Sequence, residues 1–158
     1  MVQERSSELG LGSLLRQLIA ALDGDVQAVY DGLAVSFRPR FFPVVRHLRA
    51  HGTASIGELA DHAGVSQPAI TQTLGEMRDA GLIAVEAAKD RRARRVRLTR
   101  EGEALSNRLE PVWSAVQRAE STLDDELPQP LRKMLATAIE ALARNPFYGR
   151  IMEGLEDR

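Results

Sequence analysis

Two short helix-forming segments joined by a Gly-Val-Ser turn, with two strand-forming segments directly after them, constrain the fold of this chain most. The first segment opens with Ser55 and Glu58 at capping-box spacing, and Gly64 is placed to end it. Ser66 is placed to cap the second segment, which carries Pro68 in its first turn. Two helices joined in this way predict a helix-turn-helix.

The second helix has one apolar and one polar face. Ile70, Leu74 and Met77 recur at helical spacing, so we expect them to point inward. The outward positions hold amides and hydroxyls: Gln can bond adenine through both its polar atoms, and Thr can touch a thymine methyl. The residues expected to meet a duplex from this helix are Ser66, Gln67, Pro68, Thr71 and Gln72.

An arginine-rich segment separates the two strand-forming segments, which we place at residues 82–86 and 96–98. Residues 89–100 hold seven of the chain's 21 Lys and Arg residues and a single acid. Local charge of this density suits a polyanion, although the formal net charge of the chain is −1. A solvated hairpin is the alternative interpretation, but a basic hairpin directly after a helix-turn-helix is typical of a wing.

Long amphipathic helices are expected on both sides of this part. Leucine and valine recur at three-to-four spacing from residue 11 to residue 33, and a second stripe follows Thr99 at near-heptad spacing. Pro111 predicts a kink or break near Glu110 in that second helix. The last expected helix covers residues 131–144, and Asn145-Pro146 is expected to end it. These two apolar stripes are longer than a small domain needs in order to cover its own core. They imply that a partner helix packs against them.

Five short motifs occur in a defined order between Ser55 and Gly102. They are Gly-Glu-Leu-Ala (57–60), Gly-Val-Ser (64–66), Gly-Leu-Ile (81–83), Asp-Arg-Arg-Ala-Arg-Arg (90–95) and Leu-Thr-Arg-Glu-Gly (98–102). In this order and spacing they resemble the multiple-antibiotic-resistance regulator (MarR) family, over roughly residues 9–147. The resemblance implies a two-fold dimer held by N- and C-terminal helices, with a winged helix-turn-helix on each flank.

The expected fold is therefore mostly α with a small β-wing. Residues 1–36 and 100–158 would form a helical dimerisation lobe, and residues 37–99 the winged helix-turn-helix lobe. The expected function is that of a sequence-specific regulator, a repressor, that binds double-stranded DNA as a homodimer on a pseudo-palindromic operator.

The resemblance also implies roles for the wing residues. Asp90 would brace the loop, and Arg92 at its tip would enter the minor groove, with phosphate or groove contacts from Arg91, Arg94 and Arg95. The family often has an arginine near Gln72. This helix lacks it, so more of the affinity is expected to come from the wing.

A small-molecule pocket is a further implication of the resemblance. Its candidate lining residues are Tyr30, Phe37, Phe41, Phe42, Arg46 and Trp113, and a phenolic or other aromatic anion would be the effector. The alternative interpretation is that these aromatic residues belong to the hydrophobic core. For a single residue among them, that interpretation is the one we favour.

Other functions find little support in the sequence. The chain has no cysteine, no apolar run near the ~20 residues that cross a bilayer, and no apolar secretion core near its start, so we expect a cytoplasmic protein. His47 and His51 have a spacing that can bind a metal, but without partner ligands we favour a hydrated helix face and expect no metal site. No nucleophile-base-acid order or phosphate loop stands out, so neither catalysis nor a cofactor is expected.

One alternative function stays open. A winged-helix lobe can serve as a protein-interaction module that has lost DNA binding, and similar lobes occur fused to acetyltransferase domains in relatives of this family. Such a module would act through a separate partner, for example an acetyltransferase. The weakly charged second helix supports this alternative, and the arginine-rich hairpin argues against it.

Overall fold

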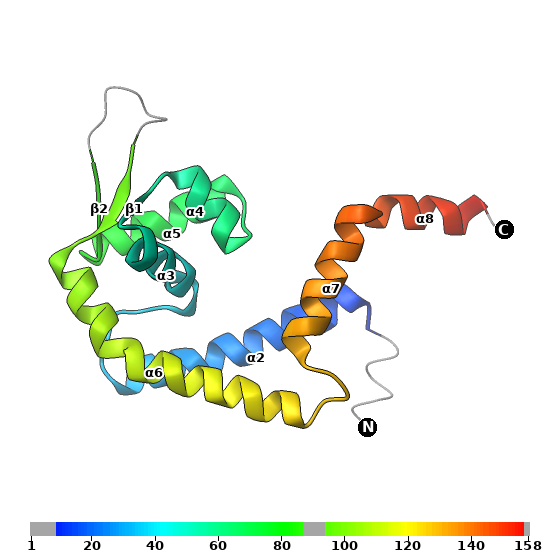
Figure 1. Cartoon of the computed structure of the whole chain (residues 1–158), viewed down its shortest axis with the longest axis horizontal. Coiled ribbons are helices and arrows are strands. Elements are labelled where there is room, and N and C mark those ends of the chain that lie inside the picture. Colours follow the sequence, from blue (N-terminus) through cyan, green and yellow to red (C-terminus); the bar gives the residue numbers. More distant parts are fainter. Residues whose placement is uncertain (1–8, 87–93, 157–158) are drawn as a thin grey trace. The chain divides into compact units, whose positions relative to one another are not determined.

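The computed structural model describes residues 9–86 and 94–156 (Figure 1). The chain divides into two compact units, one ending at Glu110 and the other beginning at Pro111. This boundary differs from the expected division into a dimerisation lobe and a DNA-binding lobe. That division stays a prediction.

The first unit is built on a helical frame. Its helices are α2 (Leu11–Gly32), the 3-10 helix η1 (Pro39–Phe41), α3 (Phe42–His51), α4 (Ile56–Ala63), α5 (Gln67–Asp79) and the first part of α6 (Arg100–Asp125). The long helix predicted from residue 11 is confirmed and runs through Gly24 without a break. Pro39 and Pro43 both lie in first turns, where a missing N–H costs nothing, and so they open η1 and α3 in succession.

A three-stranded antiparallel sheet completes this unit, in the order β1 (Thr53–Ala54), β3 (Val96–Leu98), β2 (Ile83–Val85) (Figure 1). Val96 pairs with both Ala54 and Val85, so β3 lies in the middle. The two strands of the predicted wing are confirmed. The sequence did not indicate β1, because two residues carry no alternation that could be recognised.

The core lies where the helices meet this sheet. Ile70, Leu74 and Met77 of α5 are buried as predicted, and Val96 and Leu98 are buried from β3. A second cluster consists of aromatic rings: Tyr30, Phe37 and Phe41 meet edge to face, with ring centroids 5.1 Å and 5.6 Å apart. Edge-to-face pairs add to area burial, so this cluster fastens the end of α2 to η1.

The start of α6 is pressed against the strand region. Thr99 caps it: its Oγ1 accepts from Gly102 N (3.0 Å) and donates to the Gly81 carbonyl (2.6 Å). The Thr99 N–H donates to the Leu82 carbonyl at 3.0 Å. A Cβ at Gly102 would lie 2.0 Å from that same carbonyl oxygen. Glycine at this position therefore allows the helix to approach the backbone.

The helix that follows does not break at Pro111. Helical structure continues from Arg100 to Asp125, so of the two predicted outcomes near Glu110 the break is wrong and the kink stays a prediction. Proline removes one intrahelical hydrogen bond, but Leu109 and Trp113 on either side of it are both buried, which offsets that loss.

The second unit contains the rest of α6, then α7 (Leu131–Arg144) and α8 (Phe147–Glu156). Helix α7 is confirmed, but it is not the last helix, because Asn145-Pro146 separates two helices (Figure 1). Proline is as compatible with a helix start as with a helix end, and the sequence interpretation considered only the end.

Large apolar side chains remain exposed on α2, α7 and α8. Among the described residues they include Leu11, Ile19, Leu22, Val29, Met134, Leu135, Ile139, Leu142, Phe147, Tyr148, Ile151 and Leu155. On α7, Leu135, Ile139 and Leu142 recur at helical spacing, yet all three are exposed within a single chain. No helix in the described parts of the chain is long and apolar enough to span a bilayer.

Candidate nucleic-acid interface

The turn between α4 and α5 is built by local hydrogen bonds. Ser55 N donates to Glu58 Oε2 (2.6 Å) and Ser55 Oγ accepts from Glu58 N (3.2 Å), which confirms the capping box. Gly64 ends α4 with a φ of 66°, a conformation that glycine adopts without strain. Ser66 Oγ then accepts from Ala69 N at 3.4 Å and opens α5. These caps set the angle at which α5 leaves the turn.

The outer face of α5 is polar and open. The five residues that the sequence singled out on this helix are all exposed: Ser66, Gln67, Pro68, Thr71 and Gln72. Thr71 Oγ1 donates to the Gln67 carbonyl at 2.7 Å, so its hydroxyl proton is used within the helix while its oxygen can still accept. Gly75, in the middle of this face, has no side chain, and nothing lies within 4 Å of a Cβ built there. A ligand could therefore approach the helix backbone closely at this point.

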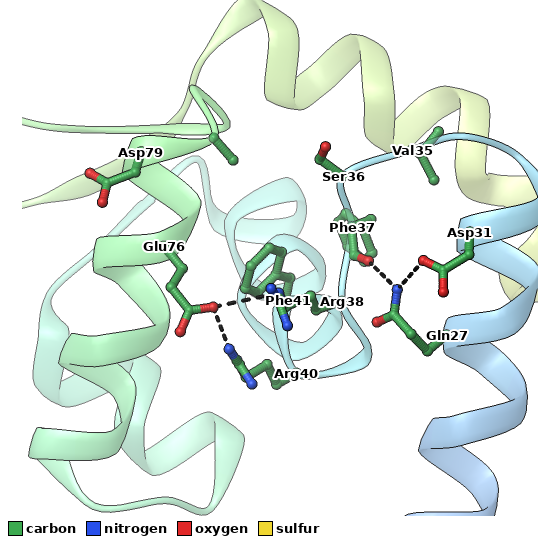
Figure 2. A pocket seen from close by; sticks show the side chains of 11 residues that line it. Gln27, Asp31, Val35, Ser36, Phe37, Arg38, Arg40, Phe41, Glu76 and Asp79 are labelled. Carbon is green, nitrogen blue, oxygen red and sulfur yellow. Dashed lines mark hydrogen bonds and ion pairs between the residues drawn. The ribbon is translucent and has the colours of Figure 1, made fainter.

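Acidic groups at the C-terminal end of α5 are neutralised by arginines. Glu76 accepts a hydrogen bond from Arg40 and pairs with Arg38, whose Nε lies 3.6 Å from the carboxylate (Figure 2). The hydrogen bond from Arg40 is the main reason why the pKa of Glu76 is lowered, with the charges of Arg40 and Arg38 adding to it. Arg78 pairs with its neighbour Asp79 at 3.0 Å. The charges at this end of α5 are therefore close to balanced, as the sequence of the helix indicated.

The structure describes two of the arginines predicted for the wing. Arg94 is exposed. Arg95 is half-buried, and its guanidinium contacts Thr53 and Glu58. Arg97, in the middle of β3, pairs with Glu86 at 3.6 Å. The remaining predicted wing residues, Asp90, Arg91 and Arg92, lie outside the described residues.

An open hollow of about 790 Å³ lies between the end of α2, the segment from Val35 to Phe41, and α5 (Figure 2). Gln27 lines it from α2, donating to Asp31 on the same helix (2.9 Å) and to the Phe37 carbonyl (3.3 Å). Figure 2 shows Arg38 and Arg40 on the side facing Glu76. The lining thus combines two arginines with three carboxylates, those of Asp31, Glu76 and Asp79, and with the aromatic residues Phe37 and Phe41.

The expected effector residues are distributed differently from this hollow. Phe37 and Phe41 line it, whereas Tyr30, Phe42, Arg46 and Trp113 are not among its lining residues. Tyr30 is only 1% exposed, and the Arg46 guanidinium lies 5.9 Å from the centroid of the Phe42 ring. The sequence analysis did not select Arg38 and Arg40. Their position in Phe-Arg-Pro-Arg-Phe, with aromatic residues on both sides, was the signal available.

Three histidines gather between α3 and α4. The His47 ring is stacked on His51 with centroids 4.3 Å apart, and its centroid lies 4.7 Å from that of His62. The pKa of His47 is lowered, first by burial and then by the two neighbouring histidines. Its Nδ1 is buried without a hydrogen-bond partner among the described residues. Within that part of the chain, no group of three or more His, Cys, Asp or Glu is arranged to hold a metal ion.

Two capped helices joined by a tight turn, followed by an antiparallel hairpin, define a winged helix-turn-helix protein. The family model described as "MarR family" matches residues 39–93, which run from η1 past β2. The resemblance to the MarR family is thus confirmed, together with the predicted fold class.

Solved structures extend the likeness beyond that segment. A MarR family transcriptional regulator from Silicibacter pomeroyi DSS-3 is 26% identical, with a TM-score of 0.63, over 84% of this chain and 94% of its own. Bordetella bronchiseptica BpsR, whose DNA binding is regulated by 6-hydroxynicotinic acid, is 20% identical with a TM-score of 0.65, over 85% and 93%. The M. tuberculosis regulator MOSR, solved with DNA, is 24% identical with a TM-score of 0.63, over 85% and 94%.

Proposed function

We propose that this chain is a cytoplasmic, sequence-specific DNA-binding repressor of transcription without catalytic activity of its own. The observation that carries the proposal is the outer face of α5, where five exposed polar or small residues follow a rigidly capped turn. Amides and hydroxyls on an open helix face match the donors and acceptors of base edges in the major groove. The M. tuberculosis regulator of the same fold, solved with DNA, supports this interpretation.

The wing supplies the electrostatic part of the proposal. Because Glu76 and Asp79 offset the cations near α5, most phosphate attraction comes from residues 89–100, which hold seven basic residues. Arg91, Arg92 and Arg94 are the proposed backbone and minor-groove contacts, with Asp90 as the brace of the loop. Neutralising phosphates displaces condensed counterions, so affinity should fall steeply with salt.

The acting species is proposed to be a homodimer. The first unit exposes apolar residues on α2, and the second unit exposes them on α7 and α8. A monomeric soluble protein rarely leaves so many large apolar side chains in water, and a second copy of the chain would cover them. Two-fold symmetry presents two α5 helices to one duplex. The operator would then be a pseudo-palindrome with half-sites about 10 bp apart.

Release from DNA is proposed to depend on a small aromatic anion. BpsR, which shares the fold, is regulated by such a compound. In this chain the ligand would lie near the aromatic residues around Phe41, either at Tyr30, Phe42 and Arg46 or in the hollow beside Arg38. A thermal-shift screen of hydroxylated aromatic acids would detect it. No stabilisation, together with unaffected DNA binding throughout, would contradict this part of the proposal.

The second candidate function is a protein-interaction module, acting for example with an acetyltransferase. The near-neutral α5, with Glu76 and Asp79 beside its outer face, is the observation that favours it. A mobility-shift titration of the full chain against random-sequence duplex at low salt separates the two candidates. Binding supports the regulator, and no binding supports the module.

Selection of bound duplexes from a random pool tests the regulator fully, because it reports affinity, palindromy and half-site spacing together. On a selected duplex, Arg92→Ala should weaken binding by about 1–3 kcal/mol. Arg132→Ala on α7 is the matched control, since it removes an equally charged and highly exposed side chain far along the chain. If both variants bind like the wild type, the wing does not contact DNA.

A further inference from the structure

The base of the wing is tied to the helix-turn-helix by one arginine. Arg95 Nε donates to Thr53 Oγ1 (3.2 Å), and Nη2 donates to the Thr53 carbonyl (3.0 Å) and to its Oγ1 (3.2 Å). Nη1 donates to Glu58 Oε2 at 3.2 Å. All three guanidinium nitrogens are therefore engaged by protein acceptors. Little of the donor fork remains for a phosphate or a base.

The two acceptors belong to different elements. Thr53 is in β1, beside the middle strand of the sheet, and Glu58 is in the first turn of α4. The Glu58 oxygen that meets Arg95 also accepts from Ser55 N at 2.6 Å, and that bond is the main reason why the pKa of Glu58 is lowered. A single carboxylate oxygen thus caps the first helix of the helix-turn-helix and holds the side chain of Arg95.

The backbone of Arg95 is fixed at the same level of the hairpin. Its carbonyl accepts from Glu86 N at 2.8 Å, one residue beyond the pairing of Val85 with Val96. Glu86 and Arg95, each one residue beyond the paired strands, are therefore joined to each other and, through the Arg95 side chain, to β1 and α4. The described base of the hairpin is thus held by backbone and side-chain hydrogen bonds at the level of Arg95.

Arg94 provides a contrast one residue earlier. It is exposed and makes no hydrogen bond or ion pair with another described residue. Side chains alternate along a strand, so Arg94 and Arg95 belong to opposite faces. Two adjacent arginines that look alike in the sequence are thus in different environments.

We propose that Arg95 is a positioning residue that orients the wing relative to the helix-turn-helix, and that it does not itself contact DNA. The proposal rests on the proposed DNA-binding function. It replaces the sequence-based expectation that Arg95 is a phosphate or groove contact. A wing that is already oriented loses less conformational freedom when it binds the duplex. Arg95 would therefore raise the affinity for DNA indirectly, by orienting the hairpin.

Glu58→Gln distinguishes a DNA contact from a positioning residue at Arg95, because the two roles predict different changes in DNA affinity. Glutamine keeps the capping-box bond to Ser55 N but loses the charge that holds Arg95. If Arg95 were a DNA contact, the variant would release it and remove a negative charge near the phosphates, so affinity would rise or stay the same. If Arg95 is a brace, affinity for a selected duplex falls, by about three- to tenfold.

Two further variants separate orientation from charge. Thr53→Val removes the hydroxyl acceptor with no change in charge and should also lower affinity. Arg95→Lys keeps the charge but cannot span Thr53 and Glu58 as the planar fork does, so it should lose affinity as Arg95→Gln does. Arg95→Lys with wild-type affinity would overturn the proposal.

The footprint distinguishes a misdirected wing from a damaged fold. In Glu58→Gln, hydroxyl-radical protection of the flanking minor grooves should weaken while methylation protection of guanines in the major groove persists. Loss of both together, with a lowered melting temperature, would overturn the proposal in favour of a purely structural role. Failure of the wild-type chain to bind any duplex would instead refute the proposed function, and is distinguishable for that reason.

Discussion

The contact at Gly102 yields a stability prediction with a definite sign. A Cβ at this position would lie 2.0 Å from the Leu82 carbonyl oxygen and 3.0 Å from its carbonyl carbon, and Cβ contacts under 3.0 Å essentially do not occur. In Gly102→Ala, the start of α6 or the strand region must therefore move by about 1 Å. The obstacle is backbone, and the same carbonyl accepts from Thr99 N, so the shift also strains the helix cap.

The magnitude follows from two opposing effects. Overpacking of this kind costs about 3 kcal/mol at the upper end of its usual range. Alanine in a helix gains about 1 kcal/mol over glycine. The net loss is about 2 kcal/mol, which for a chain of 158 residues corresponds to a melting temperature lower by roughly 4–8 °C.

Calorimetry or circular dichroism of the full chain measures this effect. The matched control is Gly75→Ala on α5, because nothing lies within 4 Å of a Cβ built there. That variant should be more stable than the wild type by about 0.5–1 kcal/mol, although the added methyl lowers DNA affinity if the α5 face enters the groove. A Gly102→Ala variant that melts at or above the wild-type temperature would refute the reasoning.

Three further predictions concern charge and assembly. Burial and two neighbouring histidines lower the pKa of His47, so the unfolded chain binds more protons below about pH 6.5 and the free energy of unfolding should decrease as the pH falls there. In His47→Gln, the melting temperature should depend less on pH between pH 7 and pH 5. The same pH dependence in the wild type and the variant would contradict this prediction. Because the pKa of Glu76 is lowered in the folded chain, its ionised carboxylate stabilises the fold above about pH 4.5, and this stability is lost as the pH falls through the pKa of the folded state. The difference in melting temperature between the wild type and Glu76→Gln should therefore shrink below pH 4.5. A constant difference would contradict the stabilising role of the ion pairs. Ile139→Glu places a charge at an apolar α7 residue that is 69% exposed in one chain, so the variant should sediment as a monomer and lose specific DNA binding, whereas Lys133→Glu on the same helix should do neither.

Much of the local structure could be predicted because its causes are local. The bonds that cap α4 and α5 connect residues three apart, so Ser55 and Ser66 are recognisable in the sequence. The buried face of α5 follows from helical spacing, as Ile70 illustrates with 1% exposure. The exposed polar face of α5 follows in the same way. The second half of α6 and the start of α8 were harder to predict, because proline is compatible with more than one position in a helix. It occurs at helix starts, at helix ends and, as at Pro111, inside a helix between buried neighbours.

The sequence by itself determined the helix-turn-helix, the hairpin after it and the concentration of arginines in that hairpin, because periodicity, caps and charge density are properties of neighbouring residues. Only the tertiary structure decided which arginines are committed to protein partners. Arg95 meets Glu58 across 37 residues and Arg40 meets Glu76 across 36. Pairings over such distances depend on how the strands and helices come together, and neither the type of a residue nor its neighbours in the chain encode them.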